Sequence, residues 1–569
     1  MVKELSKTKI KLWVTQNWFM LILIIFSSFL LFANLGTAYA PIDEANTMML
    51  SKNTMKYGLP YVWDGEYLVS PFFAGDITEE NIWISHPWLQ FYITAASFAL
   101  FGATTFAARL PFAVAGLLSI IAIYFLAKFL TKSKHFAYLT AVLLALNTTF
   151  LIYSRQSRYY SITVLFTILT MYAFLLWINK PKRSYMLFYI ISSALLFHSY
   201  YPFWVFLCIG IGIYSVYYIV FKGHLDLLKD FIIGHLILAV LTVTWFLYAM
   251  PHAPLDTGPE LSLWLKNFKI YLWKMNTWIA PVYTLVIIYL LLLLINKIRP
   301  IKKQSSDILP VKGFYVLCIC IPLYIGFISV IPILTTQYAM PVIPFFIILT
   351  ALLIWKIREF NHWIAGIVLV ICVTTNIWNI MPYIILEKTG INPKAAEVVI
   401  PNSRCDFVEG ASLEHYLKDE LAIRSYLYDH VSSLFQDYDN RVEGIVTYLN
   451  ENGNKDQTVL SFWADANAIR FYTDMKVIYE FFPLYDNPDM EHLVYQPDTK
   501  IDWIIYDTLD FYPPENPYFT FDLKDYEMVK IDSPKEYHDN VPNPDFFQFH
   551  TNNEAPQSLY ILKLKQNAE

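Results

Sequence analysis

Long, nearly uninterrupted apolar stretches recur along the first two thirds of the chain. The first, Phe19–Leu35, approaches the roughly 20 apolar residues that a helix needs to cross a bilayer. These runs are continuous and do not alternate as barrel strands do, so the sequence predicts membrane-spanning helices. Further apolar segments lie at Trp88–Phe101, Pro111–Leu130, Phe136–Tyr153, Ile162–Ile178, Met186–His198, Phe203–Phe221, Phe231–Met250, Trp278–Ile295, Phe314–Leu334, Tyr338–Trp355 and Trp363–Ile385.

The linkers between these segments alternate in charge. Basic linkers at 132–134, 180–183, 222–229, 297–303 and 356–358 are expected to face the cytoplasm, because short cytoplasmic loops are rich in Lys and Arg. The N-terminus is then cytoplasmic and the intervening loops are on the outer face. The segment Trp88–Phe101 is short, so it is either re-entrant or interfacial. We therefore predict about eleven net crossings.

Charge divides the chain of 569 residues into two parts. Residues 1–382 carry 27 Lys and Arg against 14 Asp and Glu, and residues 383–569 carry 15 against 33. We predict a membrane module over 1–382, with an active-site outer loop at 37–87, and an acidic extracytoplasmic domain over 383–569. An acidic tail excludes nucleic-acid binding. The five cysteines are scattered and show neither metal spacing nor a disulfide framework.

The tail has the alternating pattern of a small α/β domain. Residues 439–450 and 464–471 are predicted to be helices, and the apolar run at 501–507 (IDWIIYD) is a predicted buried strand. Helices that alternate with strands indicate a layered sheet with helices on its faces. The remaining predicted strands are 458–462, 476–479, 526–531 and 558–565.

Two adjacent acids, Asp43 and Glu44, follow the first apolar segment directly. A carboxylate at the membrane face can act as a general base toward a hydroxyl group if its neighbours tune it. His86 closes the same outer loop, just before the chain returns to lipid. It is a candidate for phosphate binding, metal ligation or proton transfer, and equally for a helix-capping role.

Arg155 and Arg158 form a second polar group, in the sequence Ser-Arg-Gln-Ser-Arg-Tyr at 154–159. They lie on the side of the membrane where positive charge is not expected, and three residues apart they share one helical face. The planar fork of donors on arginine suits phosphate oxygens. We predict a phosphate site that includes Arg155, Arg158 and Tyr159, with contact to lipid headgroups as the alternative.

Other outer-face residues are candidates for a substrate pocket. His198, Tyr200 and Tyr201 lie together, and the loop 251–276 carries further ionisable residues. The alternative for these residues is the interfacial belt that Tyr and Trp form at bilayer surfaces. The ionisable residues of that loop are His252, Asp256 and Glu260.

In this order and spacing, these patterns resemble the dolichyl-phosphate-mannose–protein mannosyltransferase superfamily of GT-C glycosyltransferases (family 39-like), which includes bacterial aminoarabinose transferases. The resemblance spans roughly residues 15–360. Its carriers are Asp43-Glu44, Ser85-His86-Pro87, Ala108-Arg109-Leu110-Pro111-Phe112, Tyr153 to Tyr159, and a fainter match at Gln337-Tyr338-Ala339-Met340-Pro341.

The resemblance implies a polytopic α-helical membrane enzyme of the GT-C type. Such an enzyme moves a sugar from a polyprenyl (dolichyl or undecaprenyl) monophosphate to a hydroxyl of a glycan, lipid or protein on the outer face. Asp43 matches the base of the family, and basic groups hold the leaving phosphate. Relatives often carry Glu-Lys where Ser85-His86 stands, so no cofactor is certain and a divalent metal is left open. Gln337 replaces a basic residue, which weakens a phosphate role there and leaves Gln337 and Tyr338 as pocket candidates.

Two other classes of protein fit the same pattern. A flippase or transporter would also have many spans, but should carry charged or broken segments in mid-membrane. A catalytically inactive relative would act through its C-terminal domain. The clustering of ionisable residues at one face favours the enzyme.

Overall fold

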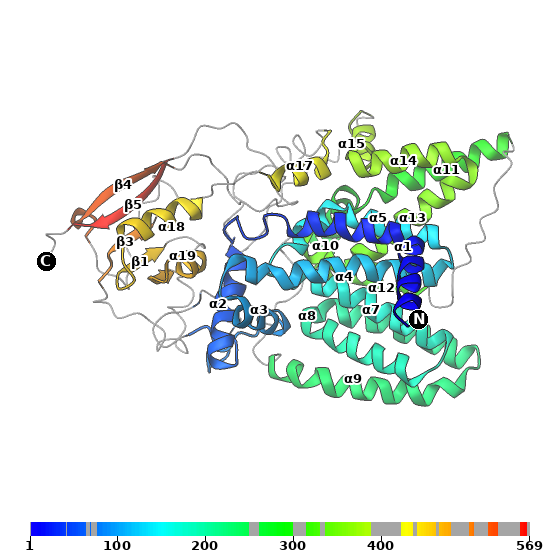
Figure 1. The fold of residues 1–569 in the computed structure, drawn as a ribbon, viewed down its shortest axis with the longest axis horizontal. Helices are drawn as coiled ribbons and strands as arrows, with labels where there is room; N and C mark the ends of the chain where they lie inside the picture. Colours follow the sequence, from blue (N-terminus) through cyan, green and yellow to red (C-terminus); the bar gives the residue numbers. More distant parts are fainter. Residues whose placement is uncertain are drawn as a thin grey trace.

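The computed structural model describes residues 2–40, 42–63, 69, 77–249, 261–299, 315–330, 336–388, 423–435, 441–461, 466–479, 500–505, 522–532 and 558–565. A helical bundle occupies most of the molecule, and a small sheet with two helices lies at one end (Figure 1). The bundle helices are α1 (Val2–Phe32), α2 (Ile42–Tyr57), α3 (Leu89–Phe101), α4 (Thr105–Thr131), α5 (Lys134–Ala145), α6 (Thr148–Ser154), α7 (Tyr160–Asn179), α8 (Arg183–Ser215), α9 (Leu228–Ala249), α10 (Leu261–Lys274), α11 (Val282–Ile298), α12 (Tyr315–Ile328), α13 (Ile343–Phe360), α14 (His362–Thr374) and α15 (Ile377–Lys388). Short 3₁₀ or π segments lie at Val216–Phe221, Leu225–Leu227, Met275–Ile279 and Thr336–Val342.

The bundle has the dimensions of a multi-pass membrane protein. Within the described residues, five helical stretches are long and apolar enough to cross a membrane, or up to seven if each of two bent helix pairs forms one span. This confirms the predicted helical membrane class. Four shorter apolar helices accompany them, α3 among them. The prediction of eleven crossings stays a prediction.

The predicted segment Phe136–Tyr153 is broken in the structure. It forms α5 and α6, whose axes differ by 62°. Asn147 lies at the break, where its side-chain oxygen accepts the amide hydrogen of Phe150 (2.9 Å) and caps α6. Its amide nitrogen donates to the carbonyl of Ile279 (2.7 Å), so a partner from a distant segment stabilises the break.

The predicted segments Met186–His198 and Phe203–Phe221 are joined in one long helical stretch, α8 and the turn after it. The join is not regular, because Tyr200 has non-helical angles (φ −158°, ψ 90°). Pro202 follows and cannot donate a backbone hydrogen bond within the helix. Residues 199–202, between the two predicted segments, therefore form a kink within one helical stretch and not a separate loop.

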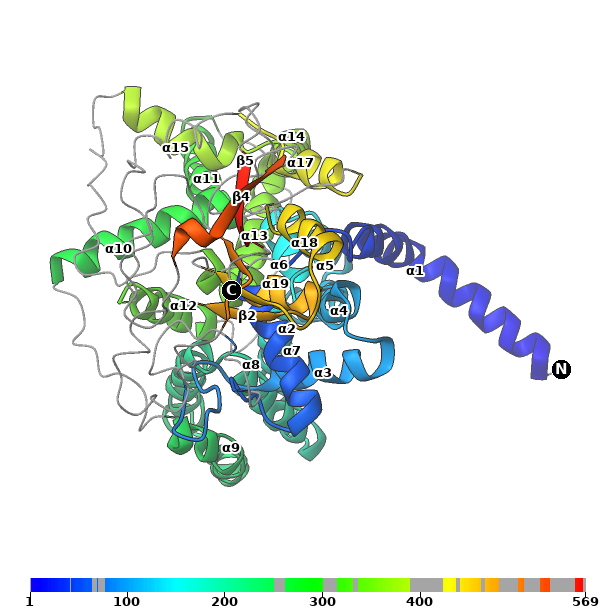
Figure 2. The ribbon, with the colours of Figure 1, turned by 90° about the vertical axis from the view of Figure 1, so that its left-hand side faces the viewer.

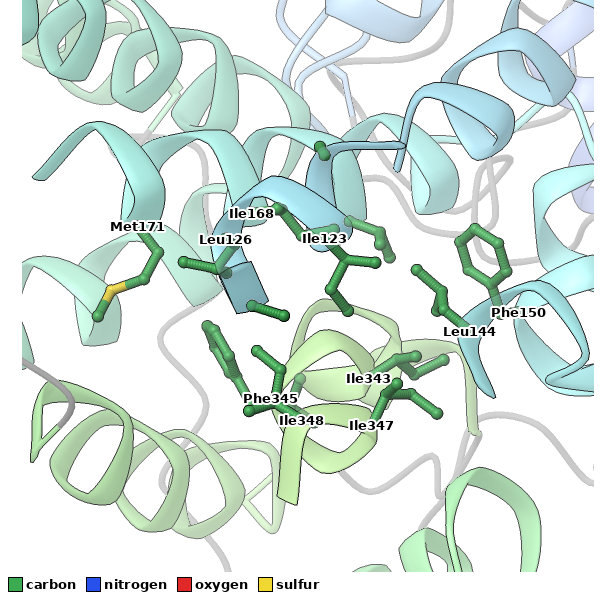
Figure 3. Close-up of a cluster of buried hydrophobic side chains, with 14 of the residues drawn as sticks. Ile123, Leu126, Leu144, Phe150, Ile168, Met171, Ile343, Phe345, Ile347 and Ile348 are labelled. Carbon is green, nitrogen blue, oxygen red and sulfur yellow. The ribbon is translucent and has the colours of Figure 1, made fainter. Parts of the chain in front are cut away.

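The centre of the bundle is a closely packed apolar core. Side chains from α4, α5, α6, α7 and α13 meet there, as Figure 3 shows for ten labelled residues. Ile123, Ile168, Ile343 and Phe150 each expose 2% or less of their surface. This core fixes α4 and α7 side by side, which places the polar residues at their ends close together.

The predicted outer loop at 37–87 contains a helix, α2, which begins at Ile42. The predicted loop 251–276 likewise contains the helix α10. His252, Asp256 and Glu260 lie outside the described residues. In Figure 1, α2 lies between the bundle and the C-terminal sheet. Figure 2 shows the N-terminal part of α1 extending away from the bundle.

The C-terminal part forms the predicted small sheet, and the directions of its strands are mixed. Its strand order is β2-β1-β3-β5-β4, with β1 parallel to β2 and β3, and β5 antiparallel to β3 and β4. The predicted helices and strands in the described residues are confirmed to within a few residues. The bounds of these elements are α18 (Arg441–Asn452), β1 (Thr458–Ser461), α19 (Ala466–Thr473), β2 (Lys476–Tyr479), β3 (Trp503–Ile505), β4 (Tyr526–Asp532) and β5 (Ser558–Leu564). The helix α17 (Tyr426–Ser433) was not predicted.

Candidate functional site

Asp43 lies in the first turn of α2, where a carboxylate is favoured by the helix dipole. Its side chain is 41% exposed, and its Oδ2 lies 3.3 Å from Nη2 of Arg158, whose side chain is only 7% exposed. Arg158 Nη1 also donates to the Asp43 carbonyl (3.3 Å) and to Thr47 Oγ1 (3.2 Å). Burial opposes the charge on Arg158, but the Asp43 carboxylate together with Tyr160 and Tyr159 raises the pKa of Arg158 above its ordinary value. A solvent-accessible carboxylate is thus held by a buried, permanently charged partner.

Glu44 has a different environment, although it is the next residue. Its side chain is 1% exposed and accepts hydrogen bonds from Arg109 Nε and Nη2, both at 2.8 Å. The backbone amide of Ser157 donates to the same carboxylate (2.7 Å). Arg109 Nη1 donates to the carbonyls of Leu35 (3.0 Å) and Ala38 (2.9 Å). This geometry favours a structural role for Glu44, which differs from the predicted catalytic role.

Arg155 lies on the C-terminal end of α1. Its Nη1 donates to the carbonyl of Leu31 (2.9 Å) and its Nη2 to that of Ala33 (2.8 Å), with longer contacts to Leu30 and Asn34. The last carbonyls of a helix have no partner within the helix, and a cation there is stabilising. Arg155 therefore caps α1, whereas the sequence predicted a phosphate ligand. Arg158 is the arginine that faces Asp43.

An aromatic stack extends from the outer loop into the bundle. The ring of His86 lies 5.3 Å from that of Tyr159, which is stacked on Tyr200 at 5.0 Å and 4°. Trp83 also stacks on His86, with ring centroids 6.3 Å apart. His86 Nδ1 and the Tyr159 hydroxyl are buried and have no hydrogen-bond partner among the described residues. Burial, together with Arg158, lowers the pKa of His86 to about 3, so the ring is neutral at physiological pH.

Tyr160 connects this stack to the predicted Gln337 and Tyr338. Its hydroxyl donates to the Gln337 side chain (2.7 Å), and the carbonyl of Tyr338 accepts a hydrogen bond from the Tyr324 hydroxyl. Arg158 lies 5.5 Å above the Tyr159 ring and 6.0 Å from the Tyr160 ring. The structure thus brings Asp43, Arg158, Tyr159 and Gln337 into one connected group.

His198 and Tyr201 lie elsewhere. Tyr201 packs against Trp245 and Phe246 of α9. His198 Nε2 donates a hydrogen bond to the backbone carbonyl of Leu241 in α9 (3.0 Å). His198 lines an apolar cavity of about 580 Å³ between α3, α8 and α9. The cavity is also lined by Ile82, Trp88, Tyr92, Trp245 and Tyr248, so it begins next to the His86 loop.

Three residues of the site carried no clear sequence signal. Thr47 supports Arg158, and the side chain of Gln90, which is fully buried, accepts the backbone amide hydrogen of Tyr159 (3.1 Å). Tyr472, from the C-terminal part, contacts the start of α2. Short polar residues in apolar stretches are common, so only the contacts reveal these roles. Among the residues that the structure describes, no group of three or more His, Cys, Asp or Glu could hold a metal ion.

Residues 85–249 match the sequence profile of the dolichyl-phosphate-mannose-protein mannosyltransferase family. The resemblance to this superfamily is confirmed. The matched region includes His86, Arg109, Arg155, Arg158 and the stacked rings of Tyr159 and Tyr200. No curated protein gives a significant sequence match to the whole chain.

Solved structures extend the likeness beyond the matched region. The crystal structure of ArnT from Cupriavidus metallidurans bound to undecaprenyl phosphate is 13% identical, with a TM-score of 0.53 over 97% of this chain and 98% of ArnT. The Archaeoglobus fulgidus oligosaccharyltransferase is also 13% identical, with a TM-score of 0.47 over 86% of this chain and 67% of that one. The likeness to ArnT shows an ArnT-like fold along nearly the whole length of this chain.

Proposed function

We propose that this protein is an inverting glycosyltransferase that moves a sugar from a polyprenyl monophosphate to a hydroxyl acceptor. The observation that carries the proposal is the exposed Asp43 carboxylate, 3.3 Å from the buried guanidinium of Arg158. The family match and the ArnT-like fold support the same chemistry. ArnT itself was crystallised with undecaprenyl phosphate.

In the proposed reaction, Asp43 accepts the proton of the acceptor hydroxyl. The acceptor oxygen then forms a bond to the anomeric carbon as the bond from that carbon to the phosphate oxygen breaks, and polyprenyl phosphate leaves with the electron pair. Arg158 orients the Asp43 carboxylate and supplies positive charge beside the leaving group. Preorganised charge of this kind stabilises a transition state because it needs no rearrangement during the reaction.

The neutral groups beside Arg158 fit the donor headgroup. His86 Nδ1 and the Tyr159 hydroxyl are buried and without partners in the described residues, and a bound phosphate or sugar would satisfy them. The cavity that begins at Ile82 and Trp88 is apolar, which suits part of a polyprenyl chain. We therefore assign the donor to His86, Arg158 and Tyr159, with Tyr200, Gln337 and Tyr338 next to them. Arg155 and Glu44 are assigned to the support of this site.

We also propose the orientation. Tyr472 of the C-terminal part contacts Ala40, three residues before Asp43, which supports a common side of the membrane for the tail and the site. The basic linkers support an extracytoplasmic position for that side. The membrane module of residues 1–382, its eleven crossings and the extracytoplasmic domain of residues 383–569 are parts of the same proposal.

Recognition of the donor phosphate can be tested without knowledge of the sugar. Native mass spectrometry of the purified protein should show tighter binding of a polyprenyl phosphate than of the polyprenol of equal chain length. Arg158→Ala should remove most of this preference, whereas Lys182→Ala, an exposed change in a basic linker, should not. Equal affinity for the phosphate and the alcohol would overturn the proposed donor class. A flippase would share the binding but release no polyprenyl phosphate from a sugar donor.

A further inference from the structure

Tyr472, near the end of α19, contacts the bundle at two points. Its hydroxyl accepts the backbone N–H of Ala40 (2.9 Å) and shares a hydrogen bond of 2.9 Å with Thr105 Oγ1. Its ring also packs on that of Tyr39, with centroids 4.3 Å apart. Burial raises the pKa of Tyr472, so the hydroxyl keeps its proton at neutral pH and can donate one bond while it accepts another.

The two contacts lie at the starts of the helices that carry the ion pair of the site. Ala40 precedes α2, with Asp43 and Glu44 three and four residues later. Thr105 is the first residue of α4, and Arg109 lies four residues later, one turn along the same face. One hydroxyl therefore joins the two backbone segments that the Glu44–Arg109 pair also joins.

The surrounding contacts make this attachment firm. Phe471 is buried in a core with Met48 and Met49 of α2, and its ring lies 6.1 Å from that of Phe98 in α3. Asp474 forms an ion pair with Lys52 of α2 (3.3 Å). Contacts thus extend from the start of α2 along two to three of its turns, and Figure 1 shows α19 beside α2.

We infer that α19 is a clamp on the catalytic segment and that Tyr472 is a positioning residue for Asp43. This inference rests on the proposed function, and it gives the C-terminal part a role in the reaction. The base must lie within hydrogen-bond reach of the acceptor hydroxyl, and a displacement of about 1 Å in such a geometry can cost about 100-fold in rate. A hydroxyl that fixes the backbone three residues before Asp43 therefore controls turnover without touching substrate.

The test compares Tyr472→Phe, which removes only the hydroxyl, with Tyr448→Phe as the matched control. Tyr448 lies in α18 of the same C-terminal part and packs on Trp503, away from α2. Hydrogen–deuterium exchange of the full-length protein reports on the amides of 36–48 and needs no substrate. Turnover with a polyprenyl-phosphate sugar gives kcat and the KM for the donor separately, and thermal unfolding monitors overall stability.

Tyr472→Phe should speed exchange within 36–48 and lower kcat about three- to tenfold, with donor KM and unfolding temperature close to those of Tyr448→Phe. Unchanged exchange in this segment would overturn the clamp, and so would faster exchange with normal kcat. A rise in KM at constant kcat would also overturn it, because the effect would then be on binding. If the wild-type protein releases no polyprenyl phosphate from any donor, the proposed function fails, while the exchange comparison still decides whether Tyr472 holds the segment.

Discussion

The Glu44–Arg109 pair gives a prediction whose size follows from the structure. Both side chains are almost fully buried, at 1% and 6% exposure, and three hydrogen bonds of 2.7–2.8 Å converge on the Glu44 carboxylate. Removal of one partner leaves a buried charge without compensation, which costs about 3–5 kcal/mol. We expect Glu44→Ala to destabilise the protein by this amount.

The measurement is thermal unfolding of the purified protein in detergent. A loss of this size corresponds to a fall in the midpoint on the order of 5–10 °C, since large proteins shift by few degrees per kcal/mol. The matched control is Glu451→Ala, at an exposed position near the end of α18, which should change the midpoint by about 1 °C or less.

The double variant provides the sharper comparison. Arg109→Ala should be as harmful as Glu44→Ala, because it leaves the carboxylate buried and unpaired. The two changes together remove both charges, so the loss should be smaller than the sum of the single losses by at least about 1 kcal/mol. Additive effects, or a Glu44→Ala midpoint equal to that of Glu451→Ala, would refute the assignment of Glu44 to structural support.

The two arginines of the Ser-Arg-Gln-Ser-Arg segment should behave differently. Arg155→Ala is expected to lower the unfolding midpoint and to leave the affinity for polyprenyl phosphate within about twofold of the wild-type value. Weakened binding at normal stability would instead show that Arg155 is a phosphate ligand. His430 is buried and its pKa is lowered to about 3 by burial and by Arg155. Below pH 6.5 the unfolded chain therefore binds a proton that the folded chain does not, and stability should fall by about 1.4 kcal/mol per pH unit toward pH 3. The variant His430→Gln should flatten this acid dependence in unfolding curves, and an unchanged slope would contradict the buried neutral state. For topology, a cysteine at exposed Asn454 in a cysteine-free background should react with an impermeant thiol reagent on intact cells, and one at exposed Ser184 should not. The reverse labelling would place the site in the cytoplasm.

Much of the fold follows from local pattern and was predictable. Continuous apolar runs predict the helices, because in lipid a helix satisfies the hydrogen bonds of its own backbone. The short strands of the tail were predictable because turns and polar residues bound each apolar run. The break between α5 and α6 was not predictable, since Asn147 finds its second partner at Ile279, 132 residues away. The helix α2 was missed because its mixed polarity resembles that of a loop.

The site could be located from the sequence, but its roles could not be assigned. The sequence does not distinguish the roles of Asp43 and Glu44, which are adjacent acids. In the structure Arg109, 65 residues away in the chain, pairs with the buried Glu44, whereas Asp43 stays exposed. In the same way, Arg155 donates hydrogen bonds to carbonyls at the end of α1, whereas Arg158 pairs with Asp43. Tyr472 carried no signal, because it meets Ala40 across 432 residues of chain.

The release of polyprenyl phosphate by the purified Asp43→Asn variant tests the central claim most directly. Wild-type protein and the control Asp226→Asn, an exposed change in a basic linker, should release it from a polyprenyl-phosphate sugar at equal rates. The variant Asp43→Asn should be slower by roughly 10²- to 10⁴-fold, the usual cost of a lost general base, while it still binds the donor. Near-normal release by Asp43→Asn would contradict the assignment of Asp43 as the base.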